Sequence, residues 1–76
     1  MKKLENYFKA ADEFNSSNDL YHIDIFVDFD TLNIFIHDIY KDKSYKLEIL
    51  HVNVKKYSVK FLLKQYYSLI DILFNE

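Results

Sequence analysis

The middle of the chain alternates apolar and polar residues with a period of two. Between residues 21 and 29 the odd positions are apolar and most of the even positions are polar. The alternation continues from 32 to 40 with its phase inverted, and a third such segment covers 44–54. A period of two is typical of half-buried strands. The sequence therefore predicts three consecutive strands, at about 21–29, 32–40 and 44–54, that form an antiparallel meander.

The inverted phase predicts a tight turn at Asp30-Thr31, which pairs Phe29 with Leu32 on one face. Because Asp-Thr suits a type I′ turn poorly, a loop longer by two residues is the alternative. A second turn near Asp42-Lys43 then fixes the register of the third strand against the second. A slip of one residue would turn the apolar side chains of a strand outward, so the pattern strongly favours this register. The rows expected on the core face are Tyr21–Tyr40–Tyr45, Ile23–Asp38–Leu47, Ile25–Ile36–Ile49 and Val27–Ile34–His51. The rows expected on the other face are His22–Ile39–Lys46, Asp24–His37–Glu48, Phe26–Phe35–Leu50 and Asp28–Asn33–Val52.

The segments on either side of the strands have helical periodicity. About residues 3–15, one stripe is apolar: it comprises Leu4, Tyr7, Phe8, Ala11 and Phe14. A second helix is expected at about 58–75, with Ser58 as its N-cap. Its polar stripe is narrow, so it is covered on more than one side, by the sheet and the first helix or by a partner chain. The fold class that follows is a two-layer α+β domain with the order αβββα, spanning residues 1–76.

Composition excludes several classes of function. The chain of 76 residues has no Cys and no Gly, so it has neither a disulfide framework nor a glycine loop that cradles phosphate. Seven Phe and seven Tyr supply apolar surface that a domain of this size needs. No apolar run of signal-peptide or membrane-spanning type is visible, so we expect a cytoplasmic protein. The favoured residues have A/T-rich codons, which points to a low-GC bacterium, phage or plasmid.

The charges are unevenly distributed along the chain. Between Lys9 and Lys41 there is no Lys, and that stretch holds seven acidic residues. From Lys41 to Lys64 there are seven Lys. An acidic edge around the first strand is therefore expected, with a more basic edge toward the third strand and second helix. Two interpretations remain open: an ordinary solvated surface that protects an edge strand, or an electrostatic surface for a basic partner.

The predicted row Asp24–His37–Glu48 is the one group of residues whose types suit a metal site or proton transfer. Carboxylates beside a histidine can bind a divalent metal or form a pH-sensitive pair, but such rows are more often cross-strand charge pairs. No Ser lies in the context of a nucleophile elbow. We therefore expect no catalytic residue, no metal, no cofactor and no enzymatic activity.

The order helix–strand–strand–strand–helix resembles the double-stranded RNA-binding domain. Lys55, Lys56 and Lys60 stand where that family places phosphate-binding lysines, at the start of the last helix. Asp30-Thr31 stands where that family has a loop that contains Gly-Pro. This resemblance implies an alternative function, nucleic-acid binding by Lys55, Lys56, Lys60 and Lys64.

The chain also resembles, in size, charge, lack of Cys and element order, the anti-CRISPR and DNA-mimic inhibitors that phages and mobile elements encode. This resemblance implies an inhibitor whose carboxylates occupy a basic groove of a host nucleic-acid-handling enzyme, such as a CRISPR effector. The expected partner-binding residues are Asp24, Phe26, Asp28, Asp30, Phe35 and Glu48. A third alternative is a small homodimeric scaffold protein without a ligand.

Overall fold

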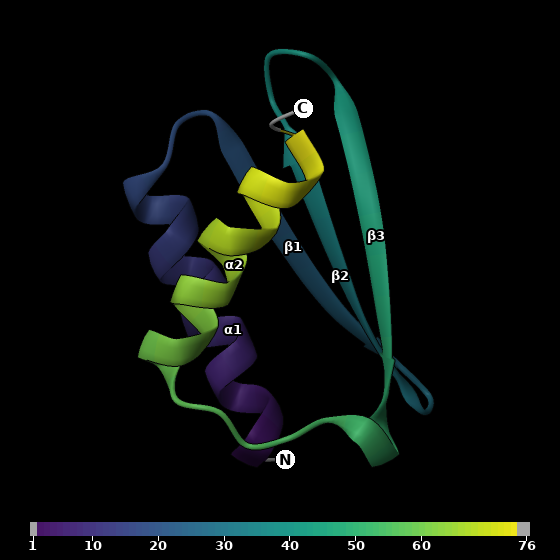
Figure 1. Ribbon diagram of the computed structural model, residues 1–76. Helices are drawn as coiled ribbons and strands as arrows, with labels where there is room; N and C mark the ends of the chain where they lie inside the picture. The colour runs from purple at the N-terminus through teal and green to yellow at the C-terminus, as the bar shows by residue number, and fades with distance from the viewer. Residues whose placement is uncertain (1, 75–76) are drawn as a thin grey trace.

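The computed structural model describes residues 2–74 and confirms the αβββα order. The elements are α1 (Lys2–Ser17), β1 (Tyr21–Asp28), β2 (Thr31–Asp38), β3 (Lys43–Leu50), the short 3₁₀ helix η1 (His51–Asn53) and α2 (Val59–Phe74). The strands form one antiparallel sheet in the order β1-β2-β3. Both helices lie on the same face of this sheet (Figure 1). The fold is therefore α+β with two layers; the expected helix end at residue 75 lies outside the described residues.

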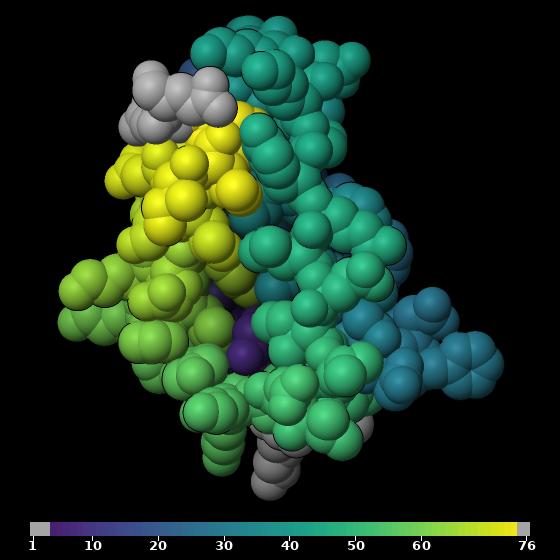
Figure 2. All heavy atoms as spheres, turned by 45° about the vertical axis from the view of Figure 1, so that its right-hand side comes forward, coloured from purple at the N-terminus to yellow at the C-terminus, as the bar shows by residue number. Residues whose placement is uncertain are grey.

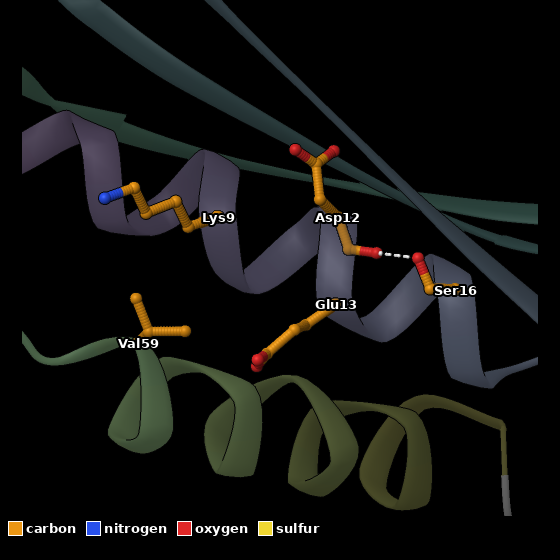
Figure 3. A pocket seen from close by; sticks show the side chains of 5 residues that line it. All are labelled: Lys9, Asp12, Glu13, Ser16 and Val59. Carbon is orange, nitrogen blue, oxygen red and sulfur yellow. Dashed lines mark hydrogen bonds between the residues drawn. The ribbon is translucent and has the colours of Figure 1, made fainter.

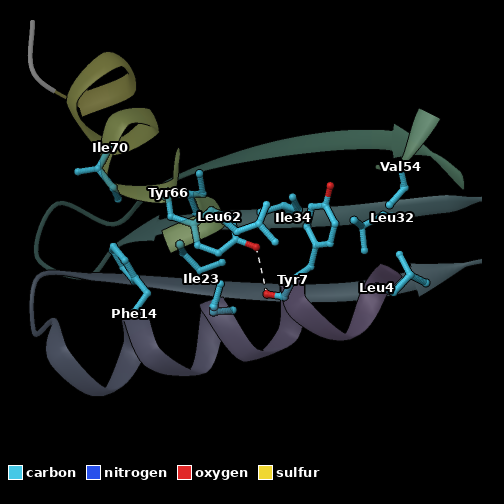
Figure 4. Close-up of a cluster of buried hydrophobic side chains, with 13 residues drawn as sticks. Leu4, Tyr7, Phe14, Ile23, Leu32, Ile34, Val54, Leu62, Tyr66 and Ile70 are labelled. Carbon is cyan, nitrogen blue, oxygen red and sulfur yellow. Dashed lines mark hydrogen bonds between the residues drawn. The ribbon is translucent and has the colours of Figure 1, made fainter. Parts of the chain in front are cut away.

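The core lies between the two helices and the covered face of the sheet (Figure 4). In α1, Ala10 and Phe14 are fully buried, and in the sheet Leu32 and Ile36 are fully buried. Each large apolar side chain buried in this way stabilises the fold by about 1.5–3 kcal/mol. Phe8 was expected in this stripe but is 38% exposed. The cluster is completed by Leu4, Tyr7, Ala11, Ile23, Ile34, Val54, Leu62, Tyr66 and Ile70.

The first turn is not where the sequence pattern placed it. The loop is Phe29-Asp30, so Asp28 lies opposite Thr31 and Phe26 lies opposite Asn33. The expected turn at Asp30-Thr31, and with it the direct pairing of Phe26 and Phe35, is wrong by two residues of register. The pattern counts Phe29 as the last buried residue of the strand, whereas the chain places it in the loop.

The second turn differs in the same way. Residues 39–42 form the loop, and Asp38 lies opposite Lys43. This register differs by four residues from the expected one, so Tyr40 and His51 leave the sheet and every expected row is wrong. Both differences are even numbers, however, and every strand residue keeps its expected face. The observed core-face rows are Tyr21–Asp38–Lys43, Ile23–Ile36–Tyr45, Ile25–Ile34–Leu47 and Val27–Leu32–Ile49.

Asp38 explains where the second turn forms. Its side chain is buried, and its Oδ1 accepts hydrogen bonds from the backbone N–H groups of Tyr40 and Lys41 at 3.1 and 2.9 Å. A carboxylate that satisfies turn N–H groups in this way favours the loop directly after itself. Asp42 completes the loop with φ 52°, a left-handed conformation that Asp tolerates better than most residues.

The link from β3 to α2 contains no third turn that pairs strands. β3 ends at Leu50, not at residue 54, and η1 leads into a segment that crosses to the helix layer (Figure 1). Tyr7 Oη donates to the carbonyl of Lys55 at 3.2 Å, which holds the crossing segment against α1. Ser58 is confirmed as the N-cap of α2, since its Oγ accepts from the N–H of Phe61 at 3.1 Å. Within residues 2–74, neither helix has the length and apolar character needed to cross a membrane.

Candidate protein-interaction surface

The face of the sheet that points away from α1 and α2 carries most of the expected partner-binding residues. The alternation of side chains places Asp24, Phe26 and Asp28 of β1 on this open face, together with Phe35 of β2 and Glu48 of β3. Phe35 is half-buried and the other four are exposed. The structure thus brings these five residues together, even though the rows expected for them are wrong.

An aromatic pair occupies the centre of the open face. The rings of Phe26 and Phe35 have centroids 5.0 Å apart and planes tilted by 31°. Lys46 Nζ lies 5.8 Å from the centroid of Phe35. Asn33, directly opposite Phe26 on β2, is buried, and its Nδ2 donates to the carbonyl of Phe26 at 3.5 Å. Phe26 is still 54% exposed, so the pair offers apolar surface to a partner.

Two of the acids on the open face have neighbours within the chain. Asp24 Oδ1 lies 3.1 Å from His22 Nε2, and Glu48 Oε2 lies 3.8 Å from Lys46 Nζ. Pairs as exposed as these contribute little to stability, because water screens them. Their carboxylates therefore remain accessible to a partner.

The expected row Asp24–His37–Glu48 does not exist. Asp24 lies opposite Phe35, and His37 lies opposite Ser44. His37 Nδ1 is 2.6 Å from Ser44 Oγ, and His37 Nε2 is 3.7 Å from Asp42 Oδ1. Within the described part of the chain, no three His, Asp or Glu side chains gather closely enough to hold a metal ion.

The tip of the β1–β2 hairpin holds a residue that the sequence pattern placed in the core. Phe29 is 98% exposed and has φ 35°, in the left-handed region. Exposed acids flank it on both sides, namely Asp28 and Asp30, and Asp30 Oδ1 accepts from Thr31 Oγ1 at 3.1 Å. The hairpin projects from the body of the molecule (Figure 2). The signal in the sequence was the order acid–Phe–acid, which interrupts the apolar alternation at a chain reversal.

The four lysines of the alternative function lie elsewhere. Lys55 and Lys56 belong to the segment that crosses to α2, whereas Lys60 and Lys64 lie one helical turn apart on α2. All four are exposed. The rings of Tyr57 and Phe61 stack beside them with centroids 4.6 Å apart. Lys60 and Lys64 thus belong to the helix layer, on the other side of the sheet from the open face (Figure 1).

Two hollows on the helix side of the molecule lie close to the elements discussed above. The larger, of about 530 Å³, is lined by Lys9, Asp12, Glu13, Ser16 and Val59 (Figure 3). Its carboxylates diverge, because Glu13 points toward α2 and Asp12 away from it (Figure 3). The smaller, of about 220 Å³, lies between α2 and β3 and has mostly apolar walls. Figure 2 shows this second opening, with part of α1 at its floor.

Comparison with protein-family models, with curated proteins and with solved structures finds no match for this chain.

Proposed function

We propose that the chain is a non-enzymatic protein-binding module that attaches to a basic protein surface through its hairpin tip and open sheet face. The observation that carries this proposal is the exposure and backbone conformation of Phe29, which is 98% exposed at positive φ between two acids. A backbone held in a sparsely populated region costs on the order of 1–3 kcal/mol. An exposed Phe side chain also forgoes the roughly 1.5–3 kcal/mol that its burial would contribute. Residues whose conformation or exposure lowers the stability of the fold in this way are typical of functional sites.

The tip continues into the aromatic centre of the open face along β1. Phe29 and Phe26 are exposed on the same hairpin, with Asp28 between them in the sequence. Aromatic side chains that become buried carry much of the affinity at protein interfaces. Acids around them steer association with a positively charged partner and determine its orientation. The surface combines both elements.

The partner that fits this chemistry is a protein groove lined with Lys and Arg. Enzymes that handle nucleic acid have such grooves, and carboxylates at a suitable spacing can occupy the places of phosphates there. We extend the proposal to a phage- or plasmid-borne inhibitor of such an enzyme, of the anti-CRISPR type, that acts in the host cytoplasm. The support for this extension is the lysine-free acidic stretch from Ala10 to Tyr40 and the resemblance in size and element order.

The test is binding of the purified chain to a panel of CRISPR effectors and other basic nucleic-acid-handling enzymes, measured by biolayer interferometry. Wild type and Phe8→Ala should bind the same target, whereas Phe29→Ala should bind it at least about tenfold more weakly, as expected for an aromatic anchor. Phe8 is the control because it is a partly exposed Phe of the helix layer. Equal binding by all three chains would overturn the role of the tip, and a panel without any binder would overturn the inhibitor proposal.

A second candidate is nucleic-acid binding by the lysine group. The observation that favours it is the stacked pair Tyr57–Phe61 beside Lys55, Lys56 and Lys60, because aromatic rings next to cations can bind unpaired bases. This candidate uses α2 and the segment that leads into it, and none of the hairpin. Variants of the hairpin tip therefore separate the two functions.

A further inference from the structure

The two edges of the sheet differ in how their backbone groups are used. At the β1 edge, the side-chain amide of Asn15 donates to the carbonyl of Ile23 and accepts from its N–H, both at 2.8 Å. Asn18 Oδ1 accepts from the N–H of Tyr21 at 3.0 Å on the same edge. These side chains occupy positions that another strand would need. The β1 edge is thus protected against strand addition.

The β3 edge has an unpaired row of backbone groups pointing outward. The bond from the N–H of His51 to the carbonyl of Asp30 shows that odd-numbered residues of this segment face β2. In an antiparallel ladder the pairs alternate, so the even-numbered residues direct their N–H and C=O groups away from β2. These residues are Ser44, Lys46, Glu48 and Leu50. Each of them is exposed, and no described element covers this edge (Figure 1).

We propose that β3 pairs antiparallel with β3 of a second copy of this chain, about a two-fold axis at Leu47. An isologous contact of this kind must be self-complementary, and β3 is. Lys46 then lies opposite Glu48 of the second copy, and Glu48 opposite its Lys46. Opposite charges in such cross-strand positions are favourable. On the core face, Tyr45 and Ile49 exchange partners in the same way.

The groove between α2 and β3 supports a second copy as the occupant of this edge. Its walls include Leu47 and Ile49 of β3 and Phe61 and Leu69 of α2. Phe61 is 42% exposed and Leu47 and Ile49 are half-buried. Continuation of the sheet would place the second copy's Tyr45, Leu47 and Ile49 beside this groove and remove part of it from water. The paired sheet has six strands, and its two open faces lie on the same side.

Charge variants test this pairing by sedimentation equilibrium, with circular dichroism to confirm folding. Wild type should dimerise, while Lys46→Glu alone and Glu48→Lys alone should each raise the dissociation constant by about tenfold, because like charges then face each other twice. The exchange Lys46→Glu with Glu48→Lys should restore wild-type affinity. An equimolar mixture of the two single variants should form heterodimers. Lys64→Glu, which makes the same charge change on α2, should dimerise like wild type.

A second measurement uses the wild-type chain only. As concentration rises, the backbone amides of Ser44, Lys46, Glu48 and Leu50 should gain protection from hydrogen exchange, whereas those of Tyr45 and Leu47 should not change. A monomer at about 1 mM, the weak limit of measurable association, would overturn the proposal. So would single variants that dimerise like wild type, or protection that does not change with concentration.

Discussion

Phe26 and Phe35 pack their rings with centroids 5.0 Å apart, although the two residues are diagonal neighbours and not a directly opposed pair. Phe26 faces Asn33 and Phe35 faces Asp24 across the β1–β2 ladder. Diagonal positions in an antiparallel pair remain within reach of aromatic side chains. The contact that the sequence pattern anticipated is therefore present, in a register that the pattern did not anticipate.

This register has a direct test by nuclear magnetic resonance. Hα–Hα contacts should connect Ile25 with Ile34 and Val27 with Leu32, while ring protons of Phe26 and Phe35 should also be in contact. Phe35→Ala should lower the free energy of unfolding by about 1 kcal/mol, within the range for an aromatic pair, and leave the fold intact. Hα–Hα contacts between Val27 and Ile34 would contradict this register.

The sequence determines the faces of the strands much better than their pairing. The alternation of Ile23, Ile25 and Val27 with polar residues reflects burial, and burial depends only on whether a position is odd or even. The register depends on which residues form the turns. In this chain without glycine, Asp38 caps one loop through its side chain and Phe29 adopts positive φ in the other. Neither event is visible in hydropathy.

The candidate site shows the same division. Five of the six expected partner-binding residues lie on the open face, because membership of a face follows from the alternation; Asp30 lies in the adjoining hairpin loop. Phe29 was assigned to the core because an apolar residue at an odd position continues the pattern. Its exposure follows from the turn. The expected row Asp24–His37–Glu48 depended on the predicted strand pairing, so it is absent in the observed register.

The buried tyrosine pair predicts how stability depends on alkaline pH. Tyr66 Oη donates to the carbonyl of Tyr7 at 3.0 Å, and burial, with a further contribution from Tyr7, raises the pKa of Tyr66 well above its usual value. Above pH of about 10 the unfolded chain loses this proton while the folded chain keeps it. The contribution of Tyr66 is therefore complete below about pH 10, and stability declines as the pH rises beyond that value.

Tyr66→Phe tests this dependence by urea denaturation between pH 8 and 12. At pH 8 the free energy of unfolding of the variant should be about 1 kcal/mol below that of wild type, the typical value for one hydrogen bond. Above pH 10 its free energy of unfolding should fall less steeply with pH than that of wild type. Tyr40→Phe is the matched control, because Tyr40 is 74% exposed in a loop. A slope equal to that of wild type would contradict the assignment.

The lysine group has its own test. If it binds RNA or DNA, a mobility shift should appear at low salt and weaken steeply as salt rises, because phosphate contacts release counterions. Lys56→Glu with Lys60→Glu should abolish the shift. Lys43→Glu with Lys46→Glu makes the same change in net charge at the β3 edge, and this variant should retain the shift. The absence of a shift for wild type at low salt would exclude the second candidate function.

The acids of the hairpin tip should govern the rate of association with a basic target. Asp28→Lys with Asp30→Lys should slow association, measured by stopped flow, and make it less sensitive to salt, while dissociation changes less. Asp12→Lys with Glu13→Lys alters the net charge equally but acts on α1, which lies in the helix layer on the other side of the sheet from the open face (Figure 1). If both double variants slow association equally, net charge and not the tip determines the rate.

Phe29→Gly should separate stability from binding. Glycine adopts positive φ without a steric penalty, so relief of strain at the tip should offset the entropy that glycine adds to the unfolded chain. We therefore expect the free energy of unfolding in urea to remain within about 1 kcal/mol of wild type, or to rise. Binding to the target should weaken at least about tenfold, mainly through faster dissociation, because the aromatic anchor is lost. A structural role for Phe29 would give the opposite result, with reduced stability and unchanged affinity.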